Sequence, residues 1–256
     1  MESFKAYLEE QKLATTTIKN HIRNLSKLDI KLLEGPEKDL AKFIKTSYEV
    51  GSGQKTITTS VAKYRGFKEL PKTEISELLK KTSNQAFEIQ KKNNQDMDLP
   101  DIKNVKSLMN LYYKQGMWKQ YCVMYLLIHI NTRNLDLVAK VTDNIDDVDN
   151  NNNWLYLRKS DTVLFRSKYK TSSTFGIKKN IIKSRPFHHA VSQLKELLRP
   201  EENLYRTVMK ITGQISESTF MKMSLCNNNN AKGIKQLAKN RGTAISTVVN
   251  NYDCTK

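Results

Sequence analysis

The stretch that decides the fold is IKQLAKNRGTAISTVVNNYDCTK, residues 234–256. Apolar Ile234 and Leu237 lie at helical spacing, and the helical pattern stops at Gly242. A second short helix is expected beyond this break. It carries Tyr252 in a setting of Asn and Asp residues, where an aromatic ring has no obvious core to fill. We therefore expect the rest of the chain to bring a cluster of cations to this tyrosine.

The composition points to a polyanionic partner. The chain has 256 residues, a net charge of +17 and a sequence pI of about 9.6. A charge this large opposes compaction, so nucleic acid is the first candidate partner and a membrane surface the second. No basic amphipathic helix with a bulky aromatic face stands out, which disfavours the membrane. The longest apolar run, residues 121–130, is too short to span a bilayer.

Cysteine and histidine usage argues against a metal site. Cys122, Cys226 and Cys254 are odd in number and widely spaced, and they form neither a metal pattern nor a disulfide framework. We therefore expect a reducing, intracellular compartment, such as cytoplasm, nucleus or a viral factory. The four histidines show no metal-binding spacing, so no metal and no cofactor are expected. Asn runs and abundant Lys are typical of an AT-rich genome, as of a virus or mobile element.

Residues 1–93 are predicted to form a small all-helical domain. Apolar residues recur at helical spacing throughout, with breaks at Gly35-Pro36 and at residues 51–53. Hydroxyl groups beside lysines suit phosphate contacts, so we expect this domain to bind DNA. The candidate DNA contacts here are Thr15, Thr17, Lys19, Lys55, Lys63 and Arg65. A polar stretch ending in Pro, residues 94–100, is the predicted linker.

Residues 101–256 are predicted to form a mixed domain. Two helices, 101–115 and 118–130, come first, and the second is the most apolar segment and the expected buried centre. Short β-rich runs at 154–157, 162–165 and 175–182 predict a small three-stranded antiparallel sheet. Helices at 203–212 and 216–225 follow. The expected fold class is therefore α+β, mostly α, with helices around a small sheet.

Three segments of this domain resemble the tyrosine recombinases, the phage-integrase family. Arg133 follows a buried helix and has Asp136 three positions on; on pattern alone it either pairs with Asp136 or points into a site. Lys170 stands before Thr171 at a predicted hairpin tip, where the family has a lysine, with Lys168 as a substitute. Tyr252 follows Gly242 by ten residues, the family's spacing to its nucleophile.

Two elements depart from the family pattern. Thr219 and Lys222 stand where the family has the His and Arg of a His-x-x-Arg box. Thr243 stands where it has a His or Trp. Arg241 could supply a cation, here counted among the DNA contacts, but its position is not the family's.

The resemblance implies a helical core-binding (SAM-like) domain, a catalytic domain and a reaction. Tyr252 would attack a DNA phosphodiester and form a 3′-phosphotyrosyl bond. Arg133 would hold the phosphate, Lys222 would add charge, and Lys170 would protonate the leaving oxygen. Thr219 and Thr243 could only donate hydrogen bonds. The implied partners are double-stranded DNA and further copies of the chain, as a homo-tetramer on two duplexes, with no small-molecule substrate.

Three alternatives stay open at the level of sequence. A catalytically degenerate DNA-binding protein would explain the charge. A type IB topoisomerase would use the same cleavage chemistry without sequence specificity. An RNA-binding protein would need stacking aromatics on its sheet, and Trp154, Tyr156 and Phe165 lie in no matching motif.

Overall fold

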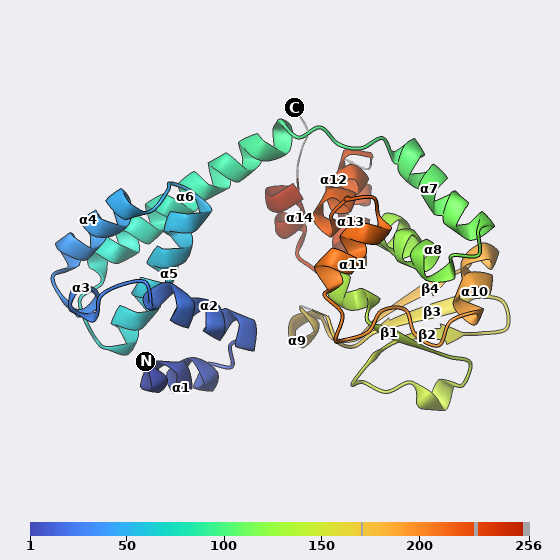
Figure 1. Cartoon of the computed structure of the whole chain (residues 1–256), viewed down its shortest axis with the longest axis horizontal. Helices are drawn as coiled ribbons and strands as arrows, with labels where there is room; N and C mark the ends of the chain where they lie inside the picture. The colour runs from blue at the N-terminus through green and yellow to red at the C-terminus, as the bar shows by residue number, and fades with distance from the viewer. Residues whose placement is uncertain (170, 228–229, 253–256) are drawn as a thin grey trace. The chain divides into compact units, whose positions relative to one another are not determined.

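The computed structural model describes residues 1–169, 171–227 and 230–252 (Figure 1). The chain divides into two compact units, Met1–Asn93 and Asn94–Lys256. The last helix of the first unit runs on to Gln95, so the first residues of the expected linker are helical.

The N-terminal unit is built from helices alone. They are α1 (Glu2–Glu10), α2 (Thr15–Leu25), α3 (Ile30–Glu34), α4 (Glu37–Ser47), α5 (Ser52–Phe67) and α6 (Thr73–Gln95). Phe4, Leu25 and Ile44 are fully buried members of its core. Between α2 and α5, His21 Nδ1 and Asn24 Nδ2 both bond to Ser60 Oγ, at 2.9 and 3.1 Å. These bonds satisfy the polar groups that the packing of the two helices buries.

The C-terminal unit combines helices with one small sheet. Its helices are α7 (Ile102–Lys114), α8 (Trp118–Tyr125), α9 (Ser172–Phe175), α10 (Arg185–Ser192), α11 (Leu204–Ile211), α12 (Glu217–Asn227), α13 (Ala231–Arg241) and α14 (Ile245–Tyr252). Single turns η1 (Leu126–Ile130), η2 (Asn134–Leu137) and η3 (Ile145–Asp147) lie between them. In Figure 1 the sheet lies at one edge of this unit, with α8 and α11–α13 gathered beside it.

The sheet has four strands, in the order β1 (Ala139–Thr142), β2 (Asn153–Leu157), β3 (Thr162–Arg166) and β4 (Lys178–Ile182). β1 pairs with β2 in parallel, whereas β2–β3 and β3–β4 are antiparallel. The α+β class is confirmed, but the expected three antiparallel strands are corrected to four in a mixed sheet. β1 escapes the sequence pattern because it has only four residues and follows η2 directly.

The connection from β3 to β4 also differs from the expected hairpin. Residues 167–177 separate the two strands, and they include the short helix α9 where a turn was expected. β4 starts only at Lys178, so residues 175–177, predicted as strand, lie outside it.

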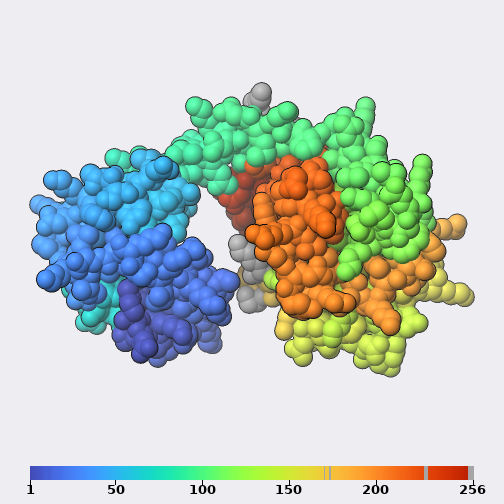
Figure 2. Space-filling view, in the orientation of Figure 1, coloured from blue at the N-terminus to red at the C-terminus, as the bar shows by residue number. Residues whose placement is uncertain are grey.

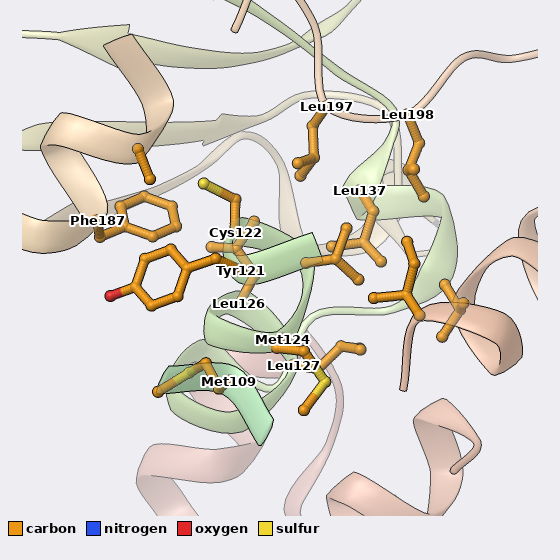
Figure 3. Packing of buried hydrophobic residues seen from close by; sticks show 14 of the residues in the cluster. Met109, Tyr121, Cys122, Met124, Leu126, Leu127, Leu137, Phe187, Leu197 and Leu198 are labelled. Carbon is orange, nitrogen blue, oxygen red and sulfur yellow. The ribbon is translucent and has the colours of Figure 1, made fainter. Parts of the chain in front are cut away.

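The core of this unit surrounds the segment that the sequence marks as its most apolar. Cys122, Met124 and Leu126 are fully buried, and Phe187 and Leu197 belong to the same cluster (Figure 3). The expected helix 118–130 is present, but its last turn, η1, is a π-helix. It ends at Asn131, whose backbone is left-handed with φ of 55°. This widened turn and sharp exit direct the chain into Arg133.

The side chain of Asn153 in β2 forms hydrogen bonds to the backbone of the segments that precede β1 and follow β3. Its Oδ1 accepts from the backbone N–H groups of Ser167 and Lys168, at 3.0 and 2.8 Å. Its Nδ2 donates to the carbonyls of Leu135, Val138 and Lys168. One buried amide thus fixes the exit of β3 against η2. It is the last residue of the Asn run at positions 150–153.

Two findings bear on the expected location of the protein. In the part of the chain that the structure describes, no helix is long and apolar enough to cross a membrane. Cys122 is a buried free thiol, whereas Cys226 is disulfide-bonded. The expectation that the cysteines form no disulfide framework does not hold at Cys226, and the expected reducing compartment stays a prediction.

The exposed surface of the C-terminal unit includes its late helices. On the face drawn in Figure 2, residues of α11–α13 (orange) adjoin those of α7 and α8 (green) in one continuous surface.

Gly242 ends α13 with φ of 63° and starts the turn to α14. A Cβ at Gly242 would lie 2.7 Å from Cε2 of the Tyr169 ring.

We expect Gly242→Ala to destabilise the protein more than Gly213→Ala does. Gly213 also has a positive φ, 66°, but a built Cβ there would meet only Leu108 Cδ2, at an ordinary contact distance of 3.8 Å. Its substitution therefore costs only the strain of the positive φ, about 1–2 kcal/mol. Gly242→Ala adds overpacking against Tyr169, about 1–3 kcal/mol more. Urea unfolding of both variants measures the difference, and equal losses would contradict the tight approach at Gly242.

Candidate active site

Arg133 is held at its backbone by a buried ion pair. Its N–H donates to Asp136 Oδ2 at 3.0 Å, across the turn η2. The same Oδ2 accepts from Arg166 Nη1 at 3.1 Å, and both side chains of this pair are 0% exposed. Burial raises the pKa of Asp136, and the charge of Arg166 opposes that rise. Asp136 thus binds the backbone of Arg133 and pairs with Arg166, not with the Arg133 side chain. That the Arg133 side chain points into a site stays a prediction.

Arg166 connects three elements to this turn. It lies at the end of β3, and its Nη2 donates to Asn180 Oδ1 of β4 at 2.9 Å and to the carbonyl of Asn240 in α13. The strand pattern places Thr162, Leu164 and Arg166 on one face of β3, and all three are buried. An arginine on the inward face of a strand indicates a buried partner.

Arg241 lies at the centre of the candidate site. It is 3% exposed, and its Nη1 donates to the Asn131 carbonyl at 3.4 Å. Its Nη2 donates to Glu217 Oε1 and, at 3.0 Å, to Tyr252 Oη. The guanidinium also lies over the Tyr252 ring, 5.1 Å from the ring centroid. Arg241 therefore contacts both the phenol oxygen and the face of the same tyrosine.

Arg133 joins this group through its side chain. Its Nη1 donates to the Arg241 carbonyl at 2.7 Å. Among the described residues, no further hydrogen bond is found for its Nε and Nη2. The group formed by Arg133, Arg241, Tyr252 and Glu217 is called the Arg–Tyr cluster below. It unites segments that are more than a hundred residues apart in the sequence.

The electrostatics of the Arg–Tyr cluster favour an anion. Burial lowers the pKa of Arg133, and the nearby charge of Arg241 lowers it further. Asp136, Glu217 and Tyr252 act in the opposite direction. Arginine stays charged in proteins despite such shifts. Two guanidinium groups therefore share one carboxylate within the cluster, which leaves it with positive charge.

Glu217 is a member that sequence analysis missed. Its Oε1 accepts from Arg241, and its Oε2 accepts from the backbone N–H of Asn134 at 2.6 Å. It begins α12, where an acidic residue is ordinarily explained by the helix dipole, so its position gave no signal. The structure shows that it fixes Arg241 against the turn that follows Arg133.

Tyr252 is not isolated from apolar surroundings. It packs against a small cluster that includes Met221, Leu237 and Val248. From the sequence we expected no apolar partners for the Tyr252 ring, and the structure corrects this expectation. Its ring is half-buried while its Oη faces Arg241.

Three other predicted catalytic residues lie on α12 and in the turn between α13 and α14. Lys222 is buried in α12, where its Nζ lies 3.5 Å from Met97 Sδ, and burial lowers its pKa. Thr219 bonds to Ser216 Oγ at 2.9 Å. Thr243 is half-buried in the α13–α14 turn, and its N–H donates to the Ala238 carbonyl at 3.1 Å. Their catalytic roles stay predictions.

Lys170 lies outside the described residues. Its neighbour Thr171 donates through Oγ1 to the Gly242 carbonyl, so the β3–β4 connection contacts the turn before α14. The substitute candidate, Lys168, is exposed.

The predicted DNA contacts of the N-terminal unit divide into two groups. Arg65 is 2% exposed and donates to the carbonyls of Pro71, Leu33 and Gly35. Its prediction as a DNA contact is wrong, because it closes the loops around α3 instead. The remaining candidates are all exposed, on α2 and α5: Thr15, Thr17, Lys19, Lys55 and Lys63. They stay predictions.

No metal site is found over residues 1–169, 171–227 and 230–252, where no group of three or more His, Cys, Asp or Glu could hold an ion.

Comparisons with known proteins add little to this geometry. No protein-family model matches the sequence, and no curated protein matches it. A crystal structure of XerA recombinase is similar over 98% of this chain and 92% of that chain. The sequence identity is 14% and the TM-score 0.37. At that TM-score the likeness carries no argument about function.

We expect Asp136→Ala to destabilise the C-terminal unit strongly. It leaves the guanidinium of Arg166 buried without its charge partner, which costs about 3–5 kcal/mol. The double variant Asp136→Ala/Arg166→Met removes both charges and should recover part of that loss. Urea unfolding measures both.

Arg158→Ala supplies the matched control for this pair. Arg158 forms an ion pair with Asp161 in the turn between β2 and β3, but its side chain is 41% exposed. Arg158→Ala should lower the free energy of unfolding far less than Asp136→Ala does, because solvent screens the Arg158–Asp161 pair. Equal losses for Asp136→Ala and Arg158→Ala would mean that the buried pair does not hold the turn.

Proposed function

We propose that this protein is a tyrosine-type site-specific DNA recombinase or integrase, which cleaves and rejoins strands through a 3′-phosphotyrosyl intermediate. The observation that carries the proposal is the hydrogen bond of 3.0 Å between Arg241 and the Tyr252 phenol, beside a second guanidinium, Arg133. A phenol among arginines is suited to attack on a phosphodiester, whose charge the arginines neutralise.

The reaction needs no group beyond the chain and its DNA. The Tyr252 phenol loses its proton to solvent, and its Oη forms a bond to phosphorus as the bond from phosphorus to the 5′-oxygen breaks. Lys170 gives a proton to that leaving oxygen. Attack by an incoming 5′-hydroxyl reverses these steps and rejoins the strand. The phosphodiester energy is conserved in the tyrosyl ester.

Arg133 is proposed to hold the phosphate. Its turn is fixed through Asp136, so the guanidinium starts from a defined backbone position. No further hydrogen bond is found for its Nε and Nη2 among the described residues, and a bidentate contact to two phosphate oxygens uses such a pair of donors.

The duplex contacts are proposed from charge and exposure. The net charge of +17 suits a DNA partner, and Lys19, Lys55 and Lys63 lie exposed on α2 and α5. A tetramer on two duplexes is proposed on the resemblance alone.

Covalent trapping from a random library tests the proposal without a known target site. The probe is a duplex with a randomised core and a fixed nick, whose short 5′-hydroxyl fragment diffuses away after cleavage. Full-length protein should become linked to a subset of sequences, which SDS treatment and sequencing identify. Tyr252→Phe should form no adduct yet still bind DNA.

Tyr205→Phe serves as the matched control, because Tyr205 is 59% exposed and lies outside the Arg–Tyr cluster. Adducts without sequence enrichment would indicate a type IB topoisomerase. DNA binding without any adduct would indicate a catalytically degenerate binding protein. An adduct with Tyr252→Phe would refute the assignment of the nucleophile.

We further expect Arg133→Lys to slow adduct formation by about 100-fold to 1,000-fold, the scale of one lost transition-state donor. Lysine keeps the charge but loses the planar fork. Single-turnover trapping on the selected duplex measures the rate. Arg206→Lys makes the same change at an exposed position of α11 and should leave the rate unchanged. Similar rates for both variants would remove Arg133 from the phosphate.

A further inference from the structure

A phosphodiester under attack presents two non-bridging oxygens, and one arginine leaves part of that charge unmatched. The sequence resemblance assigns the second cation to Lys222. In the structure, Lys222 Nζ lies 3.5 Å from the sulfur of Met97, in a buried position of α12. Arg241 instead contacts the proposed nucleophile itself.

We propose that Arg241 is a catalytic residue and supplies the second guanidinium on the scissile phosphate, in place of Lys222; this inference rests on the proposed function. Arg241 Nη2 lies 3.0 Å from Tyr252 Oη. A phosphorus atom bonded to Oη is one covalent bond from an atom that Arg241 already contacts. Its non-bridging oxygens are therefore presented to that guanidinium.

The bonds of Arg241 fix it for this role. Nη1 is held by the Asn131 carbonyl and Nη2 by Glu217, so the guanidinium cannot turn freely. The backbone carbonyl of Arg241 in turn accepts from Arg133 at 2.7 Å. One residue thus positions the first guanidinium and supplies the second. Such preorganised donors act most strongly where burial excludes water.

The resting cluster is also unsatisfied in a way that a phosphate would relieve. Arg241 Nε is buried, and the part of the chain that the structure describes offers it no hydrogen-bond partner. The like charges of Arg133 and Arg241 lie close enough to lower the pKa of Arg133. Glu217 alone compensates them within the cluster. A bound phosphodiester would add the missing negative charge.

The inference gives Arg241 and Lys222 different effects on adduct formation. On the duplex recovered from the library, Arg241→Ala should slow trapping by about 100-fold or more. Lys222→Ala should slow it by less than about 10-fold, because its Nζ lies against the sulfur of Met97 and Arg241 takes the place of the second cation. Tyr252→Phe marks the zero level, and a gel-shift assay confirms that each variant binds the duplex.

A charge-neutral substrate separates catalysis from structure. Methylphosphonate at the cleaved position removes one negative charge, so the penalty for Arg241→Ala should fall by at least about 10-fold, the effect of one charged contact. An equal penalty on both substrates would assign Arg241 a structural role and overturn the inference. So would a larger, substrate-dependent penalty for Lys222→Ala.

Two further variants control for loss of folding in Arg241→Ala. Arg241→Ala/Glu217→Gln removes the carboxylate that would otherwise lose its cation, and Arg241→Lys keeps the charge. Both should retain the urea midpoint more closely than Arg241→Ala. The double variant should show the same selective loss on the phosphate substrate as Arg241→Ala, whereas Arg241→Lys, which keeps the charge, should recover part of that loss. If the wild-type protein forms no adduct on any duplex, the proposed function fails. If it does and these variants match it, only the role of Arg241 fails.

Discussion

The buried ion pair between Asp136 and Arg166 is the interaction on which the candidate site depends. Both side chains are fully buried, so each charge requires the other. Asp136 also binds the backbone of Arg133, and Arg166 reaches Asn180 in β4 and Asn240 in α13. One pair therefore fixes a turn, a sheet and the helix that leads to Arg241.

As a result, the Tyr252 phenol lies beside two arginines, Arg133 and Arg241, whose positions are already fixed in the absence of substrate. Arg241 is held by Glu217 and by the Asn131 carbonyl, and Arg133 is held by the carbonyl of Arg241. Groups fixed before substrate arrives lose little entropy when it binds, and they need no reorganisation as charge develops. The same burial concentrates positive charge, because the guanidinium groups of Arg133, Arg166 and Arg241 lie with only two carboxylates among the described residues, those of Asp136 and Glu217. The excess positive charge therefore favours the binding of an anion, such as a phosphate group.

Sequence reasoning reached the fold class because hydrophobic periodicity dominates the long helices, and α8 stands where the most apolar run predicts it. It placed three strands where four exist, since β1 is short and pairs with β2 only through tertiary contact. Arg133 and Tyr252 were predicted from the family resemblance, and the structure brings both into contact with Arg241. Glu217 and the central place of Arg241 were not, because a partner more than twenty residues away leaves no local pattern.

The central claim is that the Tyr252 phenol becomes bonded to DNA. Mass spectrometry of the trapped adduct tests it most directly, after nuclease and protease digestion of the wild-type protein linked to its selected duplex. The account predicts a single modified peptide that carries Tyr252 esterified to a 3′-nucleotide. A nucleotide linked to any other residue, or joined through its 5′-phosphate, would contradict the account.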